Sequence, residues 1–347
     1  MEPRKLLRYQ STWDVAEVMN YLVGALSGNG PAIAFGNVSS KSVPENVAVL
    51  LATSGSTGQA KDVALPACSL IESARITNNY LGAKPGDRWS LLVSLQHAAG
   101  VNVLVRSLEL GTIPITDLNI NVDFTAIVVT QLYRALNGDQ ALLNHLKSAK
   151  AVLIGGSAIP EDLLRKGSVA GINLVTTYGM TETSGGCVYN GTPLPGVEIR
   201  IGKTVEIKSP TLAINYLGNE ALWNEKIKDG YFITDDLGQI ENGKLIITGR
   251  IDDVIISGGK NISLSEIEKS LAESFPKIES VAFALPDPEW GASLNLAIVG
   301  DFDESDIHQA LQSKYGVKAK RVLKINEFPK SALGKIDRGA LASMVSK

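Results

Sequence analysis

The chain has 347 residues, of which 44% are hydrophobic and 20% are charged, and its formal net charge at pH 7 is -3. This composition is typical of a folded globular protein and excludes disorder over most of the chain. The near balance of acidic and basic residues offers no basic stripe for a nucleic acid. No apolar run reaches the roughly 18–20 residues of a membrane-spanning helix.

The N-terminal residues and the cysteines bear on the cellular compartment. The sequence Met-Glu-Pro-Arg-Lys-Leu-Leu-Arg continues without the long apolar stretch of a secretory signal. Cys68 and Cys187 are far apart in sequence and indicate no disulfide framework, so we interpret both as small apolar fillers rather than as a catalytic thiol. We therefore expect a cytoplasmic protein.

Short β-branched runs alternate with longer helical patterns in the first half of the chain. The expected strands are Val47–Thr53, Ser90–Leu95, Ala126–Thr130, Ala151–Ile154 and Asn173–Thr177, and the expected helices are Leu65–Tyr80, Val101–Leu110, Gln131–Lys147 and Glu161–Lys166. This alternation predicts an α/β fold in which helices pack on the faces of parallel sheet.

The pattern changes from about Gly191, where short strand-like segments with many glycines and prolines predict a small, more antiparallel β unit. The pattern changes again after Gly249. There, Ser263 and Glu266 are spaced as a capping box at the start of a helix that runs to Phe275. Strands and a further helix follow, which favours a separate α+β domain. We expect an N-terminal domain over 1–248 with a short leader region (1–46), a hinge at 249–252 and a mobile C-terminal domain over 253–347.

A glycine- and hydroxyl-rich segment follows the strand Val47–Thr53 and runs to Lys61. Its glycines and hydroxyls can form an anion-binding concavity, and Lys61 adds a positive charge. The segment differs from the common P-loop, because Gln59 and Ala60 stand where that motif has lysine and a hydroxyl residue. From these residues alone, a phosphate site and an ordinary turn are both open.

Other polar segments follow expected strands. Gly155-Gly156-Ser157 suits either the close approach of a flat ring or a strand-to-helix turn. Glu182, in Tyr178–Thr183, is either an oxygen ligand for Mg²⁺ or a solvated side chain. Asp236 is suited to ribose hydroxyls or to a tight turn. Arg250 and Asp252 stand at the expected hinge, and Lys335 lies in either a mobile loop or a basic tail.

Taken in order, these segments resemble the motifs of the acyl- and aryl-CoA synthetase superfamily of adenylating enzymes. The segment Leu95–Ser107, with His97, Gly100 and Arg106, is similar to that of the o-succinylbenzoate–CoA ligases of menaquinone biosynthesis, and so is Tyr178–Thr183. The resemblance implies a two-step reaction in which Mg-ATP and a carboxylic acid give an acyl-adenylate and pyrophosphate. Coenzyme A then displaces AMP to form a thioester.

The resemblance also implies a role for each matching residue. The implied roles are stabilisation of the adenylation transition state by Lys335; metal binding by Thr57 and Glu182; phosphate binding by Thr53, Ser54, Gly55, Ser56, Thr57, Gly58 and Lys61; adenine contact by Gly155, Gly156, Ser157 and Tyr178, with Thr177, Gly179, Met180 and Thr181 in the same nucleotide site; ribose binding by Asp236 and Arg250; a pivot at Asp252; a pantetheine tunnel at Ser257, Gly258 and Gly259; and an acyl pocket bordered by His97.

Two positions depart from the family pattern. Asp62 would place a carboxylate beside Lys61 and weaken nucleotide affinity, and Asp235 would compete with Asp236 for the ribose. The second carboxylate of o-succinylbenzoate needs a partner, for which His97 and Ser184 are candidates, whereas Arg106 on its expected helix is interpreted as structural.

Alternatives remain open at this point. One is a CoA ligase for another aromatic or fatty acid, and another is a non-catalytic nucleotide-binding protein of the same fold. The oligomeric state is open as well, a homodimer being one arrangement that the sequence allows.

Overall fold

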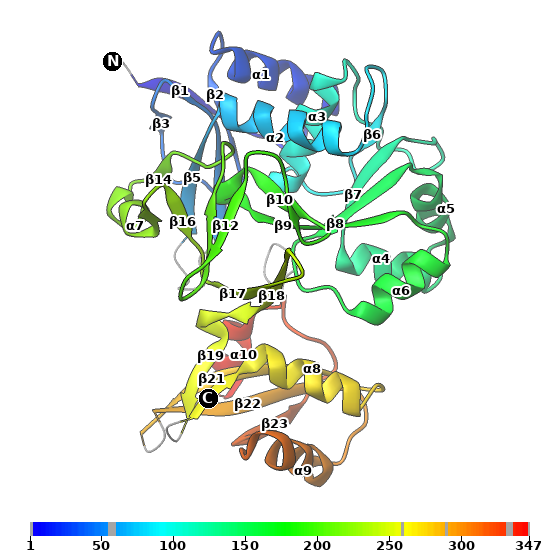
Figure 1. Ribbon diagram of the computed structural model, residues 1–347, viewed down its shortest axis with the longest axis vertical. Helices are drawn as coiled ribbons and strands as arrows, with labels where there is room; N and C mark the ends of the chain where they lie inside the picture. Colours follow the sequence, from blue (N-terminus) through cyan, green and yellow to red (C-terminus); the bar gives the residue numbers. More distant parts are fainter. Residues whose placement is uncertain (1–2, 55–59, 258–259, 289–290, 331–335, 346–347) are drawn as a thin grey trace. The chain divides into compact units, whose positions relative to one another are not determined.

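The computed structural model describes residues 3–54, 60–257, 260–288, 291–330 and 336–345. The chain divides into two compact units, Met1–Thr234 with Gln239–Ile246, and Asp235–Gly238 with Ile247–Lys347 (Figure 1). The main part of the second unit thus begins at Ile247, two residues before the expected hinge. The second unit also includes the upstream segment Asp235–Gly238.

The first sheet of the first unit has the strand order β14–β5–β4–β2–β1–β3. Its strands are β1 (Arg4–Arg8), β2 (Ala32–Phe35), β3 (Ser42–Val43), β4 (Val47–Ser54), β5 (Ala60–Pro66) and β14 (Asn215–Leu217). β1, β2 and β4 are parallel, whereas β3, β5 and β14 run antiparallel to their neighbours. The residues expected to be a leader region therefore contribute three strands and a helix to this unit.

Helices α1 (Val15–Ser27), α2 (Ala67–Tyr80) and α3 (Ala98–Glu109) pack with one face of this sheet in a shared hydrophobic core. α1 begins at a capping box formed by Asp14 and Glu17 and ends at Gly28, whose φ of 79° is left-handed. α2 was expected from Leu65, but the chain first forms β5, because Val63, Ala64 and Leu65 pair with β4 and are buried there.

The second sheet has the order β11–β10–β9–β8–β7–β6. Its strands are β6 (Trp89–Ser90), β7 (Phe124–Val128), β8 (Ala151–Gly155), β9 (Leu174–Met180), β10 (Gly185–Tyr189) and β11 (Thr192–Pro193), with the 3-10 turn η1 (Thr181–Thr183) between β9 and β10. β6 to β9 are parallel, which confirms the predicted parallel sheet.

Alternate residues of β8 enter two different cores. Val152 and Ile154 pack with α4 (Val129–Leu136), α5 (Gln140–Ser148) and α6 (Glu161–Val169), whereas Leu153 faces residues of α2 and α3. The single helix expected over Gln131–Lys147 is two helices, because Gly138 adopts a φ of 117° and Asp139 caps α5.

The rest of the first unit is antiparallel, as the sequence predicted. β12 (Glu198–Ile201), β13 (Val205–Lys208), β16 (Tyr231–Ile233) and β15 (Ile227–Lys228) pair in that order, and α7 (Glu220–Lys226) precedes β15. β17 (Asp236–Glu241) and β18 (Lys244–Arg250) form a further pair that is divided between the units. Gln239–Ile246 belongs to the first unit, and the outer ends of both strands belong to the second.

The second unit is α+β, with the sheet order β20–β19–β22–β21 and β23 parallel to β22. Its elements are η2 (Ile251–Asp253), β19 (Val254–Ser257), β20 (Lys260–Ser263), α8 (Leu264–Ser274), β21 (Glu279–Asp287), β22 (Gly291–Val299), α9 (Glu304–Tyr315), β23 (Arg321–Lys324) and α10 (Arg338–Val345). The Ser263 hydroxyl accepts the Glu266 N–H at 3.2 Å, which confirms the start of α8 and the Ser263 half of the predicted capping box.

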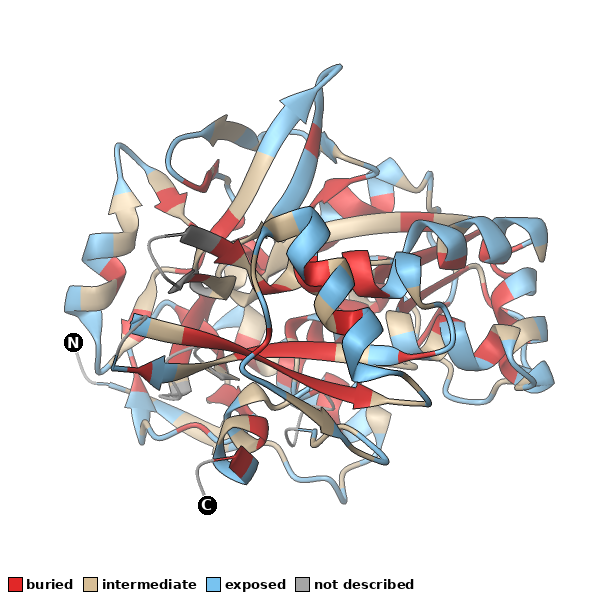
Figure 2. Cartoon of the chain, turned by 90° about the horizontal axis from the view of Figure 1, so that it is seen from below, coloured by how far each residue is buried: buried red, intermediate tan, exposed pale blue. Residues whose placement is uncertain are grey.

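Two cores lie on the two faces of this sheet. Ile267 and Leu271 of α8 pack on one face, and Leu341 of α10 packs on the other. Figure 2 shows buried residues concentrated in the strands, with exposed residues on the outer sides of the helices and on the turns.

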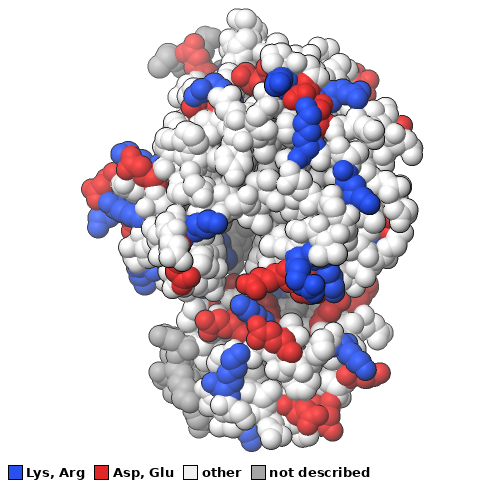
Figure 3. Space-filling model, turned by 45° about the vertical axis from the view of Figure 1, so that its right-hand side comes forward, with Lys and Arg blue, Asp and Glu red and all other residues white. Residues whose placement is uncertain are grey.

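The surface mixes charges of both signs. Basic and acidic side chains are interspersed on the face seen in Figure 3. Among the helices in the described ranges, none combines the length and the apolar character that crossing a bilayer requires.

Candidate functional site

The glycine- and hydroxyl-rich segment joins two antiparallel strands. β4 enters it and β5 leaves it, with Thr53 paired to Lys61. The predicted phosphate-binding residues Gly55, Ser56, Thr57 and Gly58 lie outside the described residues, as does the side chain of Ser54. Thr53 and Lys61 are thus brought to the same end of the hairpin, on either side of this segment.

Lys61 contacts a tyrosine that sequence reasoning missed. Its ammonium nitrogen lies 5.1 Å from the centroid of the Tyr216 ring, within the range of a cation–π interaction. The Tyr216 hydroxyl in turn donates a 2.8 Å hydrogen bond to Oε1 of Glu182. The phosphate lysine and the metal-binding glutamate proposed from sequence therefore share one neighbour, although 121 residues separate them.

Asp62 lies on the opposite face of β5 from Lys61, because successive side chains of a strand alternate. It is buried, and its Oδ2 accepts four hydrogen bonds of 2.8–3.0 Å from the backbone N–H and hydroxyl groups of Ser39 and Ser40. The expectation that this carboxylate stands beside Lys61 was therefore wrong. Its effect on nucleotide affinity stays a prediction.

The segment from Tyr178 to Thr183 lies at the end of β9 and in η1. A Cβ on Gly179 would collide with the carbonyl of Gly185, so glycine is required for the pairing of β9 with β10. The Thr183 hydroxyl bonds to the carbonyls of Met180 and Gly185 at 3.0 and 2.7 Å, which fixes the turn that carries Glu182.

Gly155 and Gly156 have different structural roles at the carboxyl end of β8. A Cβ on Gly155 would collide with the Thr177 hydroxyl and lie 2.8 Å from the Thr177 carbonyl, so this glycine allows β8 to approach β9. Gly156 adopts a φ of 89°, and Ser157 is exposed. Since parallel strands bind ligands at their carboxyl ends, the predicted adenine residues share a suitable edge.

His97 is the residue before the first turn of α3 and is half-buried. Three residues on, a Cβ at Gly100 would collide with the carbonyl of Ser94, which explains the glycine of this segment. Asn102 donates a 2.7 Å hydrogen bond to the carbonyl of Ser184, whose φ of 51° is left-handed. Among the described residues, the Ser184 hydroxyl is buried without a hydrogen-bond partner.

Arg106 and the two cysteines were interpreted from the sequence as structural residues rather than as site residues. The Arg106 guanidinium is buried over the Trp89 ring at 5.0 Å and donates to the Tyr189 hydroxyl at 3.3 Å, and burial lowers its pKa. Cys187 is buried, which raises the pKa of its thiol to about 12, as suits an inert filler. Cys68 is exposed, so its interpretation as a buried filler was wrong.

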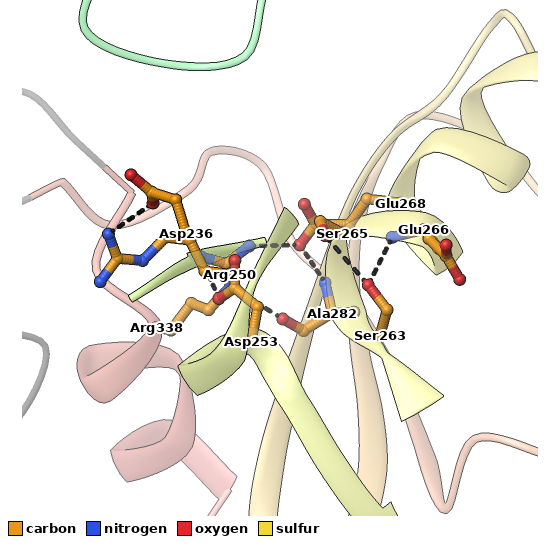
Figure 4. Close-up of polar contacts among 9 residues, drawn as sticks. All are labelled: Asp236, Arg250, Asp253, Ser263, Ser265, Glu266, Glu268, Ala282 and Arg338. Atoms are coloured by element: carbon orange, nitrogen blue, oxygen red, sulfur yellow. Dashed lines mark hydrogen bonds and ion pairs between the residues drawn. The ribbon is translucent and has the colours of Figure 1, made fainter. Parts of the chain in front are cut away.

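The second unit holds the predicted ribose residues. Arg250 donates from Nη1 to Oδ1 of the buried Asp236 at 3.0 Å (Figure 4). Its Nη2 lies 3.8 Å from Oδ2 of Asp235. Both aspartates therefore face the same arginine. Their competition for the ribose stays a prediction.

A further ion-pair network lies in the second unit (Figure 4). Arg338 donates to Oε1 of Glu268 at 2.8 Å and to the carbonyl of Ala282 at 3.0 Å, and it lies 3.8 Å from Oδ1 of Asp253. Burial raises the pKa of Glu268, and Arg338 opposes that rise. The predicted residues Gly258, Gly259 and Lys335, and the side chains of Asp252 and Ser257, lie outside the described residues.

The carboxylate of Glu182 suits a metal ion whose other ligands are phosphate oxygens and water. In the described part of the chain, no group of three or more histidine, cysteine, aspartate or glutamate side chains could hold a metal by itself. Mg²⁺ is commonly bound by one or two carboxylates together with substrate phosphates and water. The carboxylate of Glu182, with one oxygen oriented by Tyr216, fits that pattern.

Known proteins resemble the chain in sequence. A probable 2-succinylbenzoate–CoA ligase of Mycobacterium tuberculosis is 36% identical over 329 residues, which cover 86% of this chain and 85% of that protein. The 2-succinylbenzoate–CoA ligase of Lactococcus lactis is 32% identical over 333 residues, covering 86% and 71%.

Solved structures share the fold at lower sequence identity. The o-succinylbenzoate CoA synthetase of Bacillus subtilis, bound to the acyl-adenylate OSB-AMP, is 23% identical with a TM-score of 0.76 and covers 97% of this chain and 78% of its own. ATP-bound MatB of Rhodopseudomonas palustris is 20% identical with a TM-score of 0.78, covering 97% and 82%. Residues 11–210 match the family described as AMP-binding enzyme. The extent of these matches shows that the chain belongs to the family of AMP-binding enzymes.

Proposed function

We propose that the protein is a 2-succinylbenzoate–CoA ligase that works with ATP, magnesium and coenzyme A. The observation that carries this proposal is the junction of Lys61, Tyr216 and Glu182 beside the β4–β5 hairpin, in a chain that is 36% identical to a probable ligase of this type. A cation and a carboxylate held at this point match the two demands of ATP chemistry, which are phosphate binding and metal binding.

The first half-reaction joins two anions. A carboxylate oxygen of the acid attacks the α-phosphorus of ATP, and the bond to pyrophosphate breaks with its electron pair leaving on pyrophosphate. Positive charge must offset the repulsion between the reactants. The chemistry that a bound Mg²⁺ supplies is neutralisation of phosphate charge, with Thr57 and Glu182 as its protein ligands. Lys61 binds the outer phosphates, and Lys335 stabilises the charge that develops at the α-phosphate.

The second half-reaction uses the thiol of coenzyme A. Its sulfur attacks the acyl carbon of the adenylate, the thiol proton passes to water, and AMP leaves with the electron pair of the broken bond. We assign the pantetheine passage to Ser257, Gly258 and Gly259. We assign the change between half-reactions to a pivot at Asp252, with 1–248 and 253–347 as the two domains.

Nucleotide and acid are assigned to separate groups of residues. Gly155–Ser157 and Thr177–Thr181 share the carboxyl edge of β8 and β9, which supports their role around adenine. Asp236 and Arg250, already paired, are assigned to the ribose. His97 is assigned to the acyl pocket. The buried Ser184 hydroxyl is our candidate for the second carboxylate of the acid, since it makes no hydrogen bond within the described residues.

Pyrophosphate exchange tests the proposal. The protein is incubated with Mg-ATP, labelled pyrophosphate and one acid at a time from 2-succinylbenzoate, benzoate and a fatty acid. We expect label in ATP with 2-succinylbenzoate, and a thioester once coenzyme A is added. Exchange with another acid but not with 2-succinylbenzoate would show that the proposed substrate is wrong, while the proposed class of reaction would stand. Silence with every acid, in a protein shown to be folded, would favour a non-catalytic nucleotide-binding protein.

We further infer a cytoplasmic location, because the reaction consumes ATP and coenzyme A. A homodimer also stays a prediction, and sedimentation of the purified protein measures it. Both inferences are independent of the residue assignments above.

A further inference from the structure

Tyr216 joins the lysine that the proposed function assigns to phosphates and the glutamate that it assigns to the metal. We propose that Tyr216 is a positioning residue for Mg-ATP binding, whose hydroxyl orients Glu182 and whose ring face holds Lys61. This inference rests on the proposed function and adds to it a residue that makes its contribution through two others.

Tyr216 is well placed to hold its partners, because its own position is constrained. Its side chain is 1% exposed and meets Trp223 edge-to-face, with ring centroids 5.1 Å apart. Trp223 is packed in turn against Phe232. β14 lies beside β5 in the first sheet (Figure 1). Tyr216 is opposite Val63, which places the tyrosine ring on the face of β5 that carries Lys61.

Glu182 is held at its backbone as well as at its carboxylate. Its carbonyl accepts the N–H of Ala213 at 2.7 Å, and the Thr211 hydroxyl donates to the carbonyl of Thr183 at 2.9 Å. The segment that leads into β14 therefore anchors η1, and Tyr216 adds the contact at Oε1. A carboxylate has about four lone-pair sites, so one accepted hydrogen bond leaves capacity for a cation.

The choice of tyrosine matters for charge. A phenol donates a hydrogen bond while it is neutral, so it orients Glu182 without cancelling the negative charge that attracts a metal. In the same way, the ring attracts the Lys61 ammonium without neutralising it. In the described part of the chain, Lys61 and Glu182 form no ion pair with each other. Tyr216 thus leaves a cation available for phosphate and an anion available for magnesium.

The test measures ATP binding rather than turnover. Calorimetry of ATP binding to the full chain is run in EDTA and across a magnesium titration, for wild type and Tyr216→Phe. Phenylalanine keeps the ring under Lys61 but removes the donor to Glu182. We expect the magnesium concentration for half-maximal enhancement of ATP binding to rise about 10-fold or more. ATP affinity in EDTA should stay within about twofold, because the Lys61 contact is retained.

Tyr231→Phe is the matched control. The Tyr231 hydroxyl donates to Oε2 of Glu198 at 2.7 Å with the Lys208 ammonium 5.7 Å from its ring centroid, so it has similar chemistry elsewhere in the same unit. Its magnesium titration should match wild type. In a Glu182→Gln background, Tyr216→Phe should change the titration by less than about twofold, because the group that it orients has lost its charge.

The outcomes separate this inference from the proposed function. A folded Tyr216→Phe with a wild-type magnesium titration would overturn the inference while the function stands. An equal loss of ATP affinity with and without magnesium would also overturn it, because that pattern indicates general damage to the site. A folded wild-type protein that binds no ATP would overturn both.

Discussion

Replacing Asp62 by asparagine tests two views of this residue. In the structure its carboxylate stabilises the fold, whereas the sequence alone suggested that it weakens nucleotide binding at Lys61. The Asp62 carboxylate is 4% exposed, and its Oδ2 accepts four hydrogen bonds of 2.8–3.0 Å from Ser39 and Ser40. Asparagine keeps the shape and one acceptor oxygen but removes the charge. A hydrogen bond to a charged group contributes about 1.5–3 kcal/mol and one between neutral groups about 0.5–1.5 kcal/mol.

Each of the four bonds therefore weakens by about 1 kcal/mol, and bonds that share one acceptor are not fully additive. We expect Asp62→Asn to lower the free energy of unfolding by about 2–4 kcal/mol. For a unit of this size, that loss lowers Tm by about 4–16 °C. ATP affinity, measured well below Tm, should stay within about twofold of wild type because the carboxylate faces away from Lys61.

Calorimetric unfolding and ATP titration of the same samples check both expectations. Asp229→Asn is the control. The Asp229 side chain is 69% exposed, and its ion pair with Arg200 at 3.6 Å contributes about 0–1 kcal/mol. Unchanged Tm together with ATP binding strengthened more than about fivefold would refute the reasoning, since that is the behaviour expected of a carboxylate beside a lysine that binds phosphates.

Three further predictions concern the other parts of the molecule. Arg338→Met should destabilise the chain by about 1–2 kcal/mol at pH 8, after allowance for the exposure of the arginine, and by less at pH 5 in urea unfolding. Burial raises the pKa of Glu268 and Arg338 opposes that rise, so the variant raises the pKa of Glu268 further. The folded state is then destabilised at pH 8, where Glu268 must be ionised, more than at pH 5, where it can be protonated. An equal loss of stability at both pH values would contradict this. Gly155→Ala should lower the free energy of unfolding by about 1–3 kcal/mol through collision with Thr177, and unchanged stability would show that the strands can separate there. Lys335→Ala should abolish most pyrophosphate exchange yet spare thioester formation from pre-made adenylate, whereas equal losses in both steps would argue against a separate role for this lysine in adenylation.

Local sequence signals predicted the elements that depend on local physics. The parallel strands β7 to β9 follow from β-branched runs between helical patterns. The strand expected over Ser90–Leu95 was wrong in its bounds, because β6 ends at Ser90. The start of α8 follows from the spacing of Ser263 and Glu266, which are neighbours in any helix that begins there. The order of the motifs also indicated the family, and the family and sequence matches confirm it.

Features that depend on distant partners could not be predicted in this way. β5 was missed because its burial and pairing are provided by β4 across the hairpin. The expected helix over Gln131–Lys147 was too long because a glycine at positive φ interrupts a continuous apolar pattern. Cys68 and Cys187 have the same side chain, and only the packing around each makes one exposed and the other buried.

The hairpin of β4 and β5 shows which features came from the sequence and which came from the tertiary structure. By itself the sequence determined which residue types flank the loop, and it placed Lys61 and Asp62 next to each other in the chain. The tertiary structure decided that they face opposite sides of β5. Lys61 faces Tyr216, whose hydroxyl contacts Glu182, and Asp62 faces Ser39 and Ser40. The physical reason is that strand geometry alternates side chains between faces, and what each face contacts is determined by segments as far as 155 residues away in the chain.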